Sequence, residues 1–190
     1  MAHSSNSGSE TSQALTQEAL TQETLTIEAV IAKQAIHDLN AQYCRAVDRC
    51  DTPLMQSIWH PDATVDVGVF AGAAADYAEI ITQPNDVMER SFHAITNELY
   101  NIDGETAEGE AYVTAAVTLI EDGEKVERLV GGRYVDKFVK HDGLWKFYHR
   151  LFVVDWSNTF NSEQVWRDSV FAMFTNHGSR GKEDLSYSRL

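Results

Sequence analysis

The stretch 36–51, IHDLNAQYCRAVDRCD, has the pattern of a helix whose last turns lie against a core. Its apolar side chains recur at steps of three and four residues, the period of one buried helical face: Ile36, Leu39, Tyr43, Ala46 and Val47. Tyr43 and Asp48 lie five residues apart where this pattern ends, and Pro53 soon follows, which stops or redirects a helix. The stretch therefore predicts the end of a long amphipathic helix.

The same helix begins, by its sequence, at residue 27. Thr26 is an acceptable N-cap, and Glu28 lies in the first turn, where a carboxylate suits the helix dipole. We predict that the helix ends at about residues 47–49. Residues 1–26 are rich in Ser, Thr, Gln and Glu, and their five-residue repeat fits neither a helical face nor a strand, so we predict a flexible arm there.

The segment after the long helix changes pattern several times. Residues 53–61 predict a short helix with proline in its first turn. Residues 64–70 alternate valines with polar residues or glycine, which predicts a half-buried strand. The alanine-rich segment 71–83 has the spacing of a helix or lid, and residues 84–86 predict the start of another helical turn.

From residue 91 onward the chain has the pattern of antiparallel β-structure. Asp-Gly pairs mark hairpin turns, and Gly131-Gly132 marks a bulge or bend. Because helices come first and sheet follows, we predict an α+β fold with a single domain over 27–175, partly helical after 157, and a polar tail over 176–190. The predicted strands are 92–100, 107–121, 125–140 and 144–156.

The composition limits the classes of function. With 190 residues and 43% hydrophobic content, the chain can form one domain with a sizeable core. Its net charge of −14 argues against electrostatic binding to nucleic acid or an anionic membrane. No apolar run reaches the roughly 18 residues of a membrane span, and no secretory signal is recognisable, so we expect a cytoplasmic protein. Cys44 and Cys50 are expected to be free, because six residues of helix separate them.

His93 is the first candidate for chemistry. Period two on strand 92–100 places it on one face with Ile95, Asn97 and Leu99, and the two aliphatic side chains indicate a buried face. A buried histidine needs a hydrogen-bond partner. From the pattern alone, a structural histidine bonded to a backbone carbonyl is favoured over a catalytic one.

Asp48 and Tyr43 are further candidates. The helix dipole opposes a carboxylate at a helix C-terminus, so Asp48 is either a solvated or ion-paired end residue, or it orients a catalytic histidine. Tyr43 lies on the apolar face, where a core tyrosine is the simpler interpretation. An ideal helix separates the two side chains by about 140°, so helical geometry alone does not bring them together.

Arg150 lies on a strand with apolar residues on both faces. A covered arginine either binds an anion or a polar substrate group, or pairs with a carboxylate. Arg133 is a weaker candidate of the same kind. His60 and Asp62 lie two apart on a turn, and the chain has no HxH, HExxH, GxGxxG, P-loop or GxSxG motif, so we predict neither a metal nor a cofactor.

Four segments in this order resemble the SnoaL-like branch of the nuclear-transport-factor-2-like superfamily. They are YCRAVDRCD at 43–51, IWHPDATVD at 58–66, SFHAITN at 91–97 and GGRYVDKFVKHDGLWKFYHRLFVVDW at 131–156. The resemblance implies a cone, in which a curved sheet wraps around a pocket and the long helix lies across it. It also implies a His93–Asp48 pair, with Tyr43 and Arg150 beside it.

The resemblance implies a cofactor-independent lyase that performs dehydration, HX elimination or C–C cleavage on a small apolar, aromatic substrate. We predict that Trp59, Arg133 and Asn97 contact that substrate. Two alternatives stay open: an isomerase or cyclase on the same scaffold, and a non-catalytic ligand-binding or dioxygenase β-subunit-like protein. The outer sheet face, with Tyr112 and Ile120, has no second layer within the chain, so we expect a homo-oligomer, a trimer or dimer by the resemblance.

Overall fold

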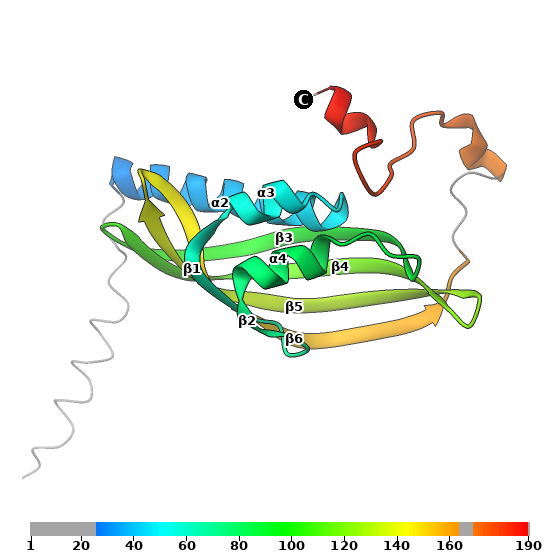
Figure 1. Ribbon diagram of the computed structural model, residues 1–190, viewed down its shortest axis with the longest axis horizontal. Helices are drawn as coiled ribbons and strands as arrows, with labels where there is room; N and C mark the ends of the chain where they lie inside the picture. The colour runs from blue at the N-terminus through cyan, green and yellow to red at the C-terminus, as the bar shows by residue number, and fades with distance from the viewer. Residues whose placement is uncertain (1–25, 164–168, 190) are drawn as a thin grey trace, which may run out of the picture.

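The computed structural model describes residues 26–163 and 169–189. Figure 1 shows a curved sheet with helices along it and a C-terminal segment above the first helix. The predicted arm lies outside the described residues, apart from Thr26. In chain order the elements are α2 (Ile27–Asp48), α3 (Thr52–Ser57), β1 (Trp59–Asp66), β2 (Ala71–Ala73), α4 (Ala74–Thr82), β3 (Met88–Asp103), β4 (Thr106–Glu121), β5 (Glu124–His141), β6 (Leu144–Asn161), and the 3₁₀ turns η1 (Ser169–Met173) and η2 (Leu185–Ser188).

Helix α2 has the bounds that the sequence predicted. The Thr26 side chain accepts a hydrogen bond from the Ala29 N–H at 3.1 Å, which caps the first turn. The helix ends at Asp48, and Asp51 then caps α3 by accepting from the Leu54 N–H. The apolar side chains that the sequence predicted on one helical face are all buried in the structure, so α2 packs against the core along that face.

The six strands form one mixed sheet in the order β2-β1-β6-β5-β4-β3. Strands β3 to β6 form an antiparallel meander, and β1 pairs in parallel with β6. The expected hairpin turns and the bulge at Gly131-Gly132 are present, since the register shifts between these two glycines. The predicted α+β class is therefore confirmed.

Three predicted boundaries between α3 and β3 are wrong. The short helix ends at Ser57, and β1 begins at Trp59, five residues earlier than predicted. Its parallel pairing with β6 shifts register between Trp59 and Thr64, which lets the strand pass Pro61. No helical turn follows Pro84, because the Asn85 side chain accepts from the N–H groups of Val87 and Met88 and forms a turn before β3.

The sheet has one covered face and one open face. Helix α4 lies in front of the central strands in Figure 1, and α2 runs along the edge strand β3. The opposite face exposes large side chains, among them Phe92, Tyr112 and Trp156, which are 62%, 43% and 47% exposed. This open face agrees with the expected oligomer, which stays a prediction. No helix in the described ranges is long and apolar enough to cross a membrane.

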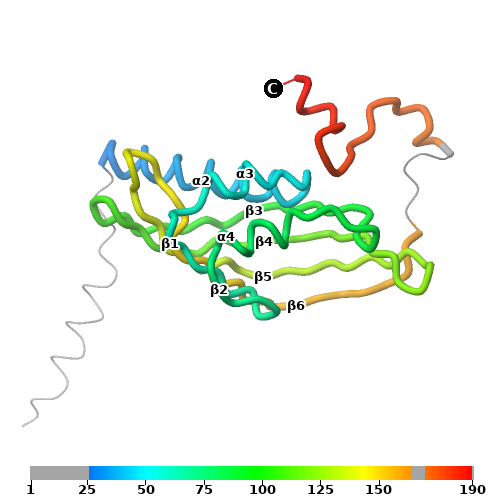
Figure 2. Tube along the Cα trace, in the orientation of Figure 1, coloured from blue at the N-terminus to red at the C-terminus, as the bar shows by residue number. Residues whose placement is uncertain are grey.

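The C-terminal segment returns to the end of α2, as the tube in Figure 2 shows. Tyr187 donates its hydroxyl to Asp51 at 2.6 Å, and Arg45 donates to Ser186 at 3.0 Å. Asp184 accepts from the backbone N–H of Ser179 at 2.9 Å. The sequence predicted only a polar tail here, and the described part of this tail is held on its own chain.

Candidate active site

Asp48 and His93 are joined by two hydrogen bonds. The Asp48 Oδ1 atom lies 2.7 Å from the His93 Nδ1 atom, and Asp48 Oδ2 accepts from the His93 backbone N–H at 3.0 Å. The two side chains are 10% and 14% exposed. An ionised carboxylate can only accept hydrogen bonds, so Nδ1 carries the proton in this contact. In the neutral ring the free lone pair is then on Nε2.

The fold brings these residues together from 45 positions apart in the chain. Asp48 is the last residue of α2, and His93 lies on the edge strand β3, directly opposite Ala115 of β4. Because α2 packs along β3, the end of the helix meets the strand at the histidine. The contact that the resemblance implied is present, and it supplies a partner for His93, which is half-buried in the structure.

His93 lines a cavity of about 270 Å³ between α2, α4 and the sheet. The other side chains in its wall are apolar, except for the hydroxyl groups of three tyrosines. Such a cavity favours a small, uncharged, mostly apolar ligand. The remaining lining residues are Tyr43, Val47, Val67, Val69, Tyr77, Ile81, Met88, Val113, Ala115, Val117, Val130, Tyr134 and Phe152.

The phenols gather around Tyr43. The Tyr43 and Tyr77 hydroxyl oxygens are 2.7 Å apart, and the Tyr43 and Tyr134 rings meet edge to face with centroids 5.6 Å apart. Burial raises the pKa of Tyr43, although the charge of Arg150 and hydrogen bonding lower it. Burial also raises the pKa of Tyr77 and of Tyr134 well above the usual value. All three therefore present neutral hydroxyl groups near neutral pH.

Arg150 lies behind the phenols and does not line the cavity. Its guanidinium carbon is 4.2 Å from the ring centre of Tyr43 and 3.8 Å from that of Tyr134. Its Nε and Nη2 atoms donate to the two oxygens of Asp136 at 2.9 and 2.7 Å, and Nη2 also donates to Asn40 at 2.6 Å. Burial lowers the pKa of Arg150, but the carboxylate of Asp136 has the opposite effect, and the pKa is raised overall. Of the two predicted roles for Arg150, binding a substrate group or pairing with a carboxylate, the structure shows the ion pair.

Three residues expected to contact substrate lie elsewhere. Arg133 is on the outer sheet face, where it pairs with Glu110 and Asp155. Asn97 sits at a register shift of β3 with a φ of 50°, and this bulge ends the period-two pattern that placed it beside His93. Trp59 is buried against Tyr43 with ring centres 6.2 Å apart, so it supports the cavity wall without lining it.

The sequence analysis missed Tyr77 and Tyr134. Tyr77 lies on α4, the segment predicted as a helix or lid, and its apolar spacing could have placed it on the inner face. Tyr134 is two residues from the glycine pair and faces Phe152 of β6. Alternation along the strand from Arg133, a charged residue on the outer face, gives Tyr134 an inward position, so both residues had a detectable signal.

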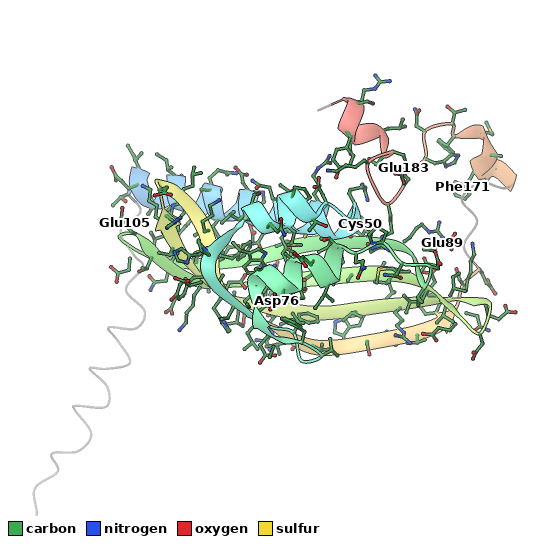
Figure 3. The ribbon with its side chains drawn as sticks, viewed as in Figure 1. Cys50, Asp76, Glu89, Glu105, Phe171 and Glu183 are labelled. Carbon is green, nitrogen blue, oxygen red and sulfur yellow. The ribbon has the colours of Figure 1, made fainter. Side chains whose placement is uncertain are left out.

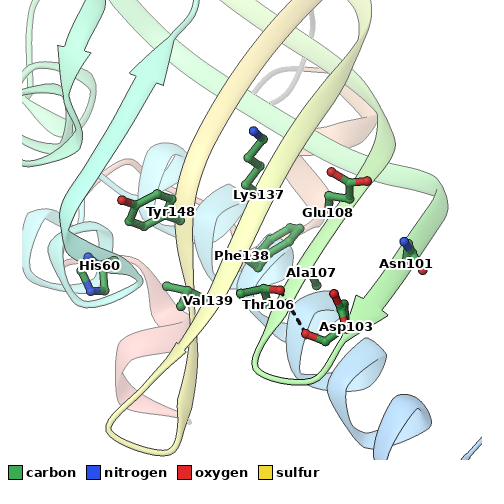
Figure 4. Close-up of a pocket in the computed structure, with 10 residues that line it drawn as sticks. All are labelled: His60, Asn101, Asp103, Thr106, Ala107, Glu108, Lys137, Phe138, Val139 and Tyr148. Carbon is green, nitrogen blue, oxygen red and sulfur yellow. Dashed lines mark hydrogen bonds between the residues drawn. The ribbon is translucent and has the colours of Figure 1, made fainter.

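A larger hollow, of about 640 Å³, lies at the opposite end of the strands (Figure 4). Its lining mixes polar or charged side chains such as Glu108 and Lys137 with apolar ones such as Phe138, and includes none of the predicted catalytic residues. Within the described ranges, no group of three or more His, Cys, Asp or Glu side chains could hold a metal ion. The candidate site is therefore the smaller cavity beside His93.

A family model described as the SnoaL-like domain matches residues 28–151. A search of curated proteins found no match. Among solved structures, a hexachlorocyclohexane dehydrochlorinase, LinA-type3, from Novosphingobium barchaimii is 21% identical, with a TM-score of 0.62 over 72% of this chain and 94% of that chain. At this identity the likeness concerns the fold.

Two structures from Novosphingobium aromaticivorans are also similar. A scytalone dehydratase candidate is 18% identical, with a TM-score of 0.60 over 72% of this chain and 92% of that chain. An aromatic ring hydroxylase candidate is 26% identical, with a TM-score of 0.61 over 73% of this chain and 96% of that chain. The sheet and helices described above are thus shared with proteins of differing chemistry.

Proposed function

The chain belongs to the SnoaL-like domain family, and on that premise we propose that it is a cofactor-independent lyase acting on a small, apolar, aromatic molecule. The observation that carries the proposal is the hydrogen-bonded pair of His93 and Asp48 at the wall of an apolar cavity. The names of two similar structures, a dehydrochlorinase and a dehydratase candidate, support an elimination reaction.

In this proposal His93 is the general base. Its Nε2 atom takes a proton from the carbon next to the one that bears the leaving group, the C–H electron pair forms the new double bond, and the leaving group departs with its own electron pair. Asp48 keeps the proton on Nδ1 and stabilises the imidazolium that forms. In a C–C cleavage of the same class, His93 would take a hydroxyl proton instead.

The phenols serve the leaving group. A neutral Tyr43 hydroxyl can donate a hydrogen bond, or its proton, to a departing oxygen, and Tyr77 shares a 2.7 Å hydrogen bond with that hydroxyl. Arg150 acts through the tyrosines, because its positive charge behind Tyr43 favours negative charge on that phenol oxygen. Arg150 is therefore a positioning residue in this account.

Elimination assays with hexachlorocyclohexane and scytalone as probes test the proposal, with chloride release and loss of water as readouts. A positioned base contributes about 10²–10⁴ in rate, so His93→Ala and Asp48→Asn should each lose at least about two decades. His149→Ala is the matched control, because His149 lies on β6 and hydrogen-bonds Thr64 outside the cavity. Wild-type turnover with unchanged rates in both test variants would contradict the proposal. Deuterium returned to the same carbon of an unconverted or isomerised probe would favour the isomerase alternative.

A further inference from the structure

Three arginines line one small pocket of an otherwise acidic chain. The pocket has a volume of about 260 Å³, and Arg49, Arg90 and Arg180 lie in its wall with Glu127. The chain has 15 basic and 29 acidic side chains, so three arginines around one pocket are a local concentration of basic groups. Figure 3 shows the neighbouring residues Cys50, Glu89 and Glu183 at this end of the molecule.

The pocket also presents buried hydrogen-bond donors. The Ser91 side chain is buried, with 8% of the residue exposed, and its Oγ atom has no hydrogen-bond partner in the described part of the chain. The Nε atom of Arg180 is likewise buried without a hydrogen-bond partner in the described residues, whereas the buried Nε atom of Arg49 faces Asp184 Oδ2 at 3.4 Å. Buried donors are ordinarily satisfied, and the Ser91 hydroxyl and the Arg180 Nε belong to residues that line one pocket. Two unsatisfied donors at one pocket favour a ligand that accepts hydrogen bonds.

The arginines are held in place by the fold. Arg180 donates from Nη1 to the Met88 carbonyl at 2.7 Å, and Arg49 donates from Nη1 to the Asp48 carbonyl at 3.2 Å. Asp184 fixes the loop that carries Arg180, because its carboxylate accepts from the Ser179 N–H. The two guanidinium groups are therefore positioned by backbone contacts from either side of the pocket.

Three carboxylates lie near the three arginines. Glu127 accepts the Thr118 hydroxyl at 3.1 and 3.0 Å, which satisfies part of its hydrogen-bonding capacity, and Arg49 lies 3.4 Å from Asp184. Arg90 lies 3.9 Å from Glu89. Arg180 makes no ion pair with any carboxylate of the described residues, so its charge is the one available to a ligand.

We propose that this pocket binds a carboxylate or phosphate group, held by the guanidinium groups of Arg180 and Arg49 and the hydroxyl of Ser91. A guanidinium presents paired N–H donors that match the oxygens of both groups. The pocket adjoins the candidate active site along the chain, since Arg49 follows Asp48 and Ser91 precedes His93 by two residues. The anionic group belongs either to the substrate itself or to a separate molecule.

Calorimetric titration with inorganic phosphate and with acetate tests the site. We expect saturable binding of at least one probe by the wild-type protein, about tenfold weaker binding by Arg180→Gln, and weaker binding by Ser91→Ala. Arg128→Gln is the matched control, because Arg128 pairs with Glu121 outside the pocket, and it should bind as the wild type does. Ser91→Ala removes one buried hydroxyl and keeps the test valid if Arg180→Gln does not fold. Absence of saturable binding, or equal affinity in all variants, would overturn the proposal.

Competition with 4-phenylbutyrate then distinguishes the two sources of the anion. If phenylbutyrate displaces phosphate and also shifts the NMR signals of the His93 ring, one molecule spans the pocket and the cavity, and the anionic group belongs to the substrate. If it displaces phosphate without moving those signals, the pocket serves a separate anion. Either result supports the anion site. Because neither measurement depends on the lyase reaction, the anion site and the proposed function can fail independently.

Discussion

Both carboxylate oxygens of Asp48 bind one residue, His93. One oxygen receives the imidazole Nδ1–H and the other receives the backbone N–H of the same residue. The carboxylate thus fixes the strand to the helix and fixes the ring on the strand. An asparagine held in the same position replaces one oxygen with an NH2 group, so one of these two N–H donors would face another donor. The proposed function depends on this contact more than on any other.

Replacing Arg150 should strongly destabilise the protein. Arg150→Met leaves the fully buried Asp136 without its counter-charge, and breaking a buried pair in this way costs about 3–5 kcal/mol. Urea denaturation would measure the loss. The double variant Arg150→Met/Asp136→Leu should recover part of it, while Arg133→Met, whose partners are on the outer face, should change stability little. Equal losses in the two arginine variants would contradict the assignment.

Acid should release the C-terminal segment. Hydrogen bonds from Ser186 and Ser179 lower the pKa of Asp184 from 3.8 to about 2. Because the folded pKa lies below the unfolded one, the stabilisation is complete above about pH 4 and is lost as the pH falls through about 2. At neutral pH, a protease should cut the tail of Asp184→Asn faster than that of the wild type. At low pH the two tails should be cut at the same rate. A difference that persisted at low pH would contradict this linkage.

Cys44 should resist alkylation in the folded protein. It is buried, and burial raises the pKa of its thiol to about 12, so the reactive thiolate is scarce. Cys50 is partly exposed and offers a reference site in the same chain. Mass spectrometry after iodoacetamide treatment should find Cys50 labelled first and Cys44 labelled only after denaturation. Equal labelling rates in the native protein would show that the α2 core is more open than described.

Tyr77→Phe should lower activity without unfolding the protein. The change removes one hydroxyl and its 2.7 Å contact with Tyr43. A hydrogen bond of this kind contributes about 0.5–1.5 kcal/mol, which corresponds to a rate lower by roughly two- to thirteenfold. Steady-state kinetics on an eliminated probe would measure it, with Tyr148→Phe as control, since Tyr148 lies outside the cavity. A rate equal to that of the wild type would remove Tyr77 from the account.

The local pattern of the sequence predicted much of this fold. Thr26 and Asp48 bound the first helix as expected, and the Asp-Gly pairs set the hairpins, because caps and turns depend on near neighbours. The start of β1 at Trp59 was not predictable in this way, because its pairing partner Phe147 lies far along the chain. Long-range pairing decided that boundary.

The candidate site was predictable only in part. Periodicity placed His93 on a buried face but could not supply its partner, which came from the family resemblance. Period two then failed at the bulge that turns Asn97 outward, since one extra residue reverses the faces of a strand. Arg150 was recognised as covered, yet only the register that sets it opposite Asp136 identifies what it binds.

Nitrogen NMR of the His93 ring tests the central claim most directly, and it needs no substrate. In the wild-type protein, we predict that the neutral ring carries its proton on Nδ1 and keeps Nε2 unprotonated toward the cavity. In Asp48→Asn the ring should no longer keep this single tautomer. A wild-type ring protonated on Nε2, or a spectrum that Asp48→Asn leaves unchanged, would contradict the account.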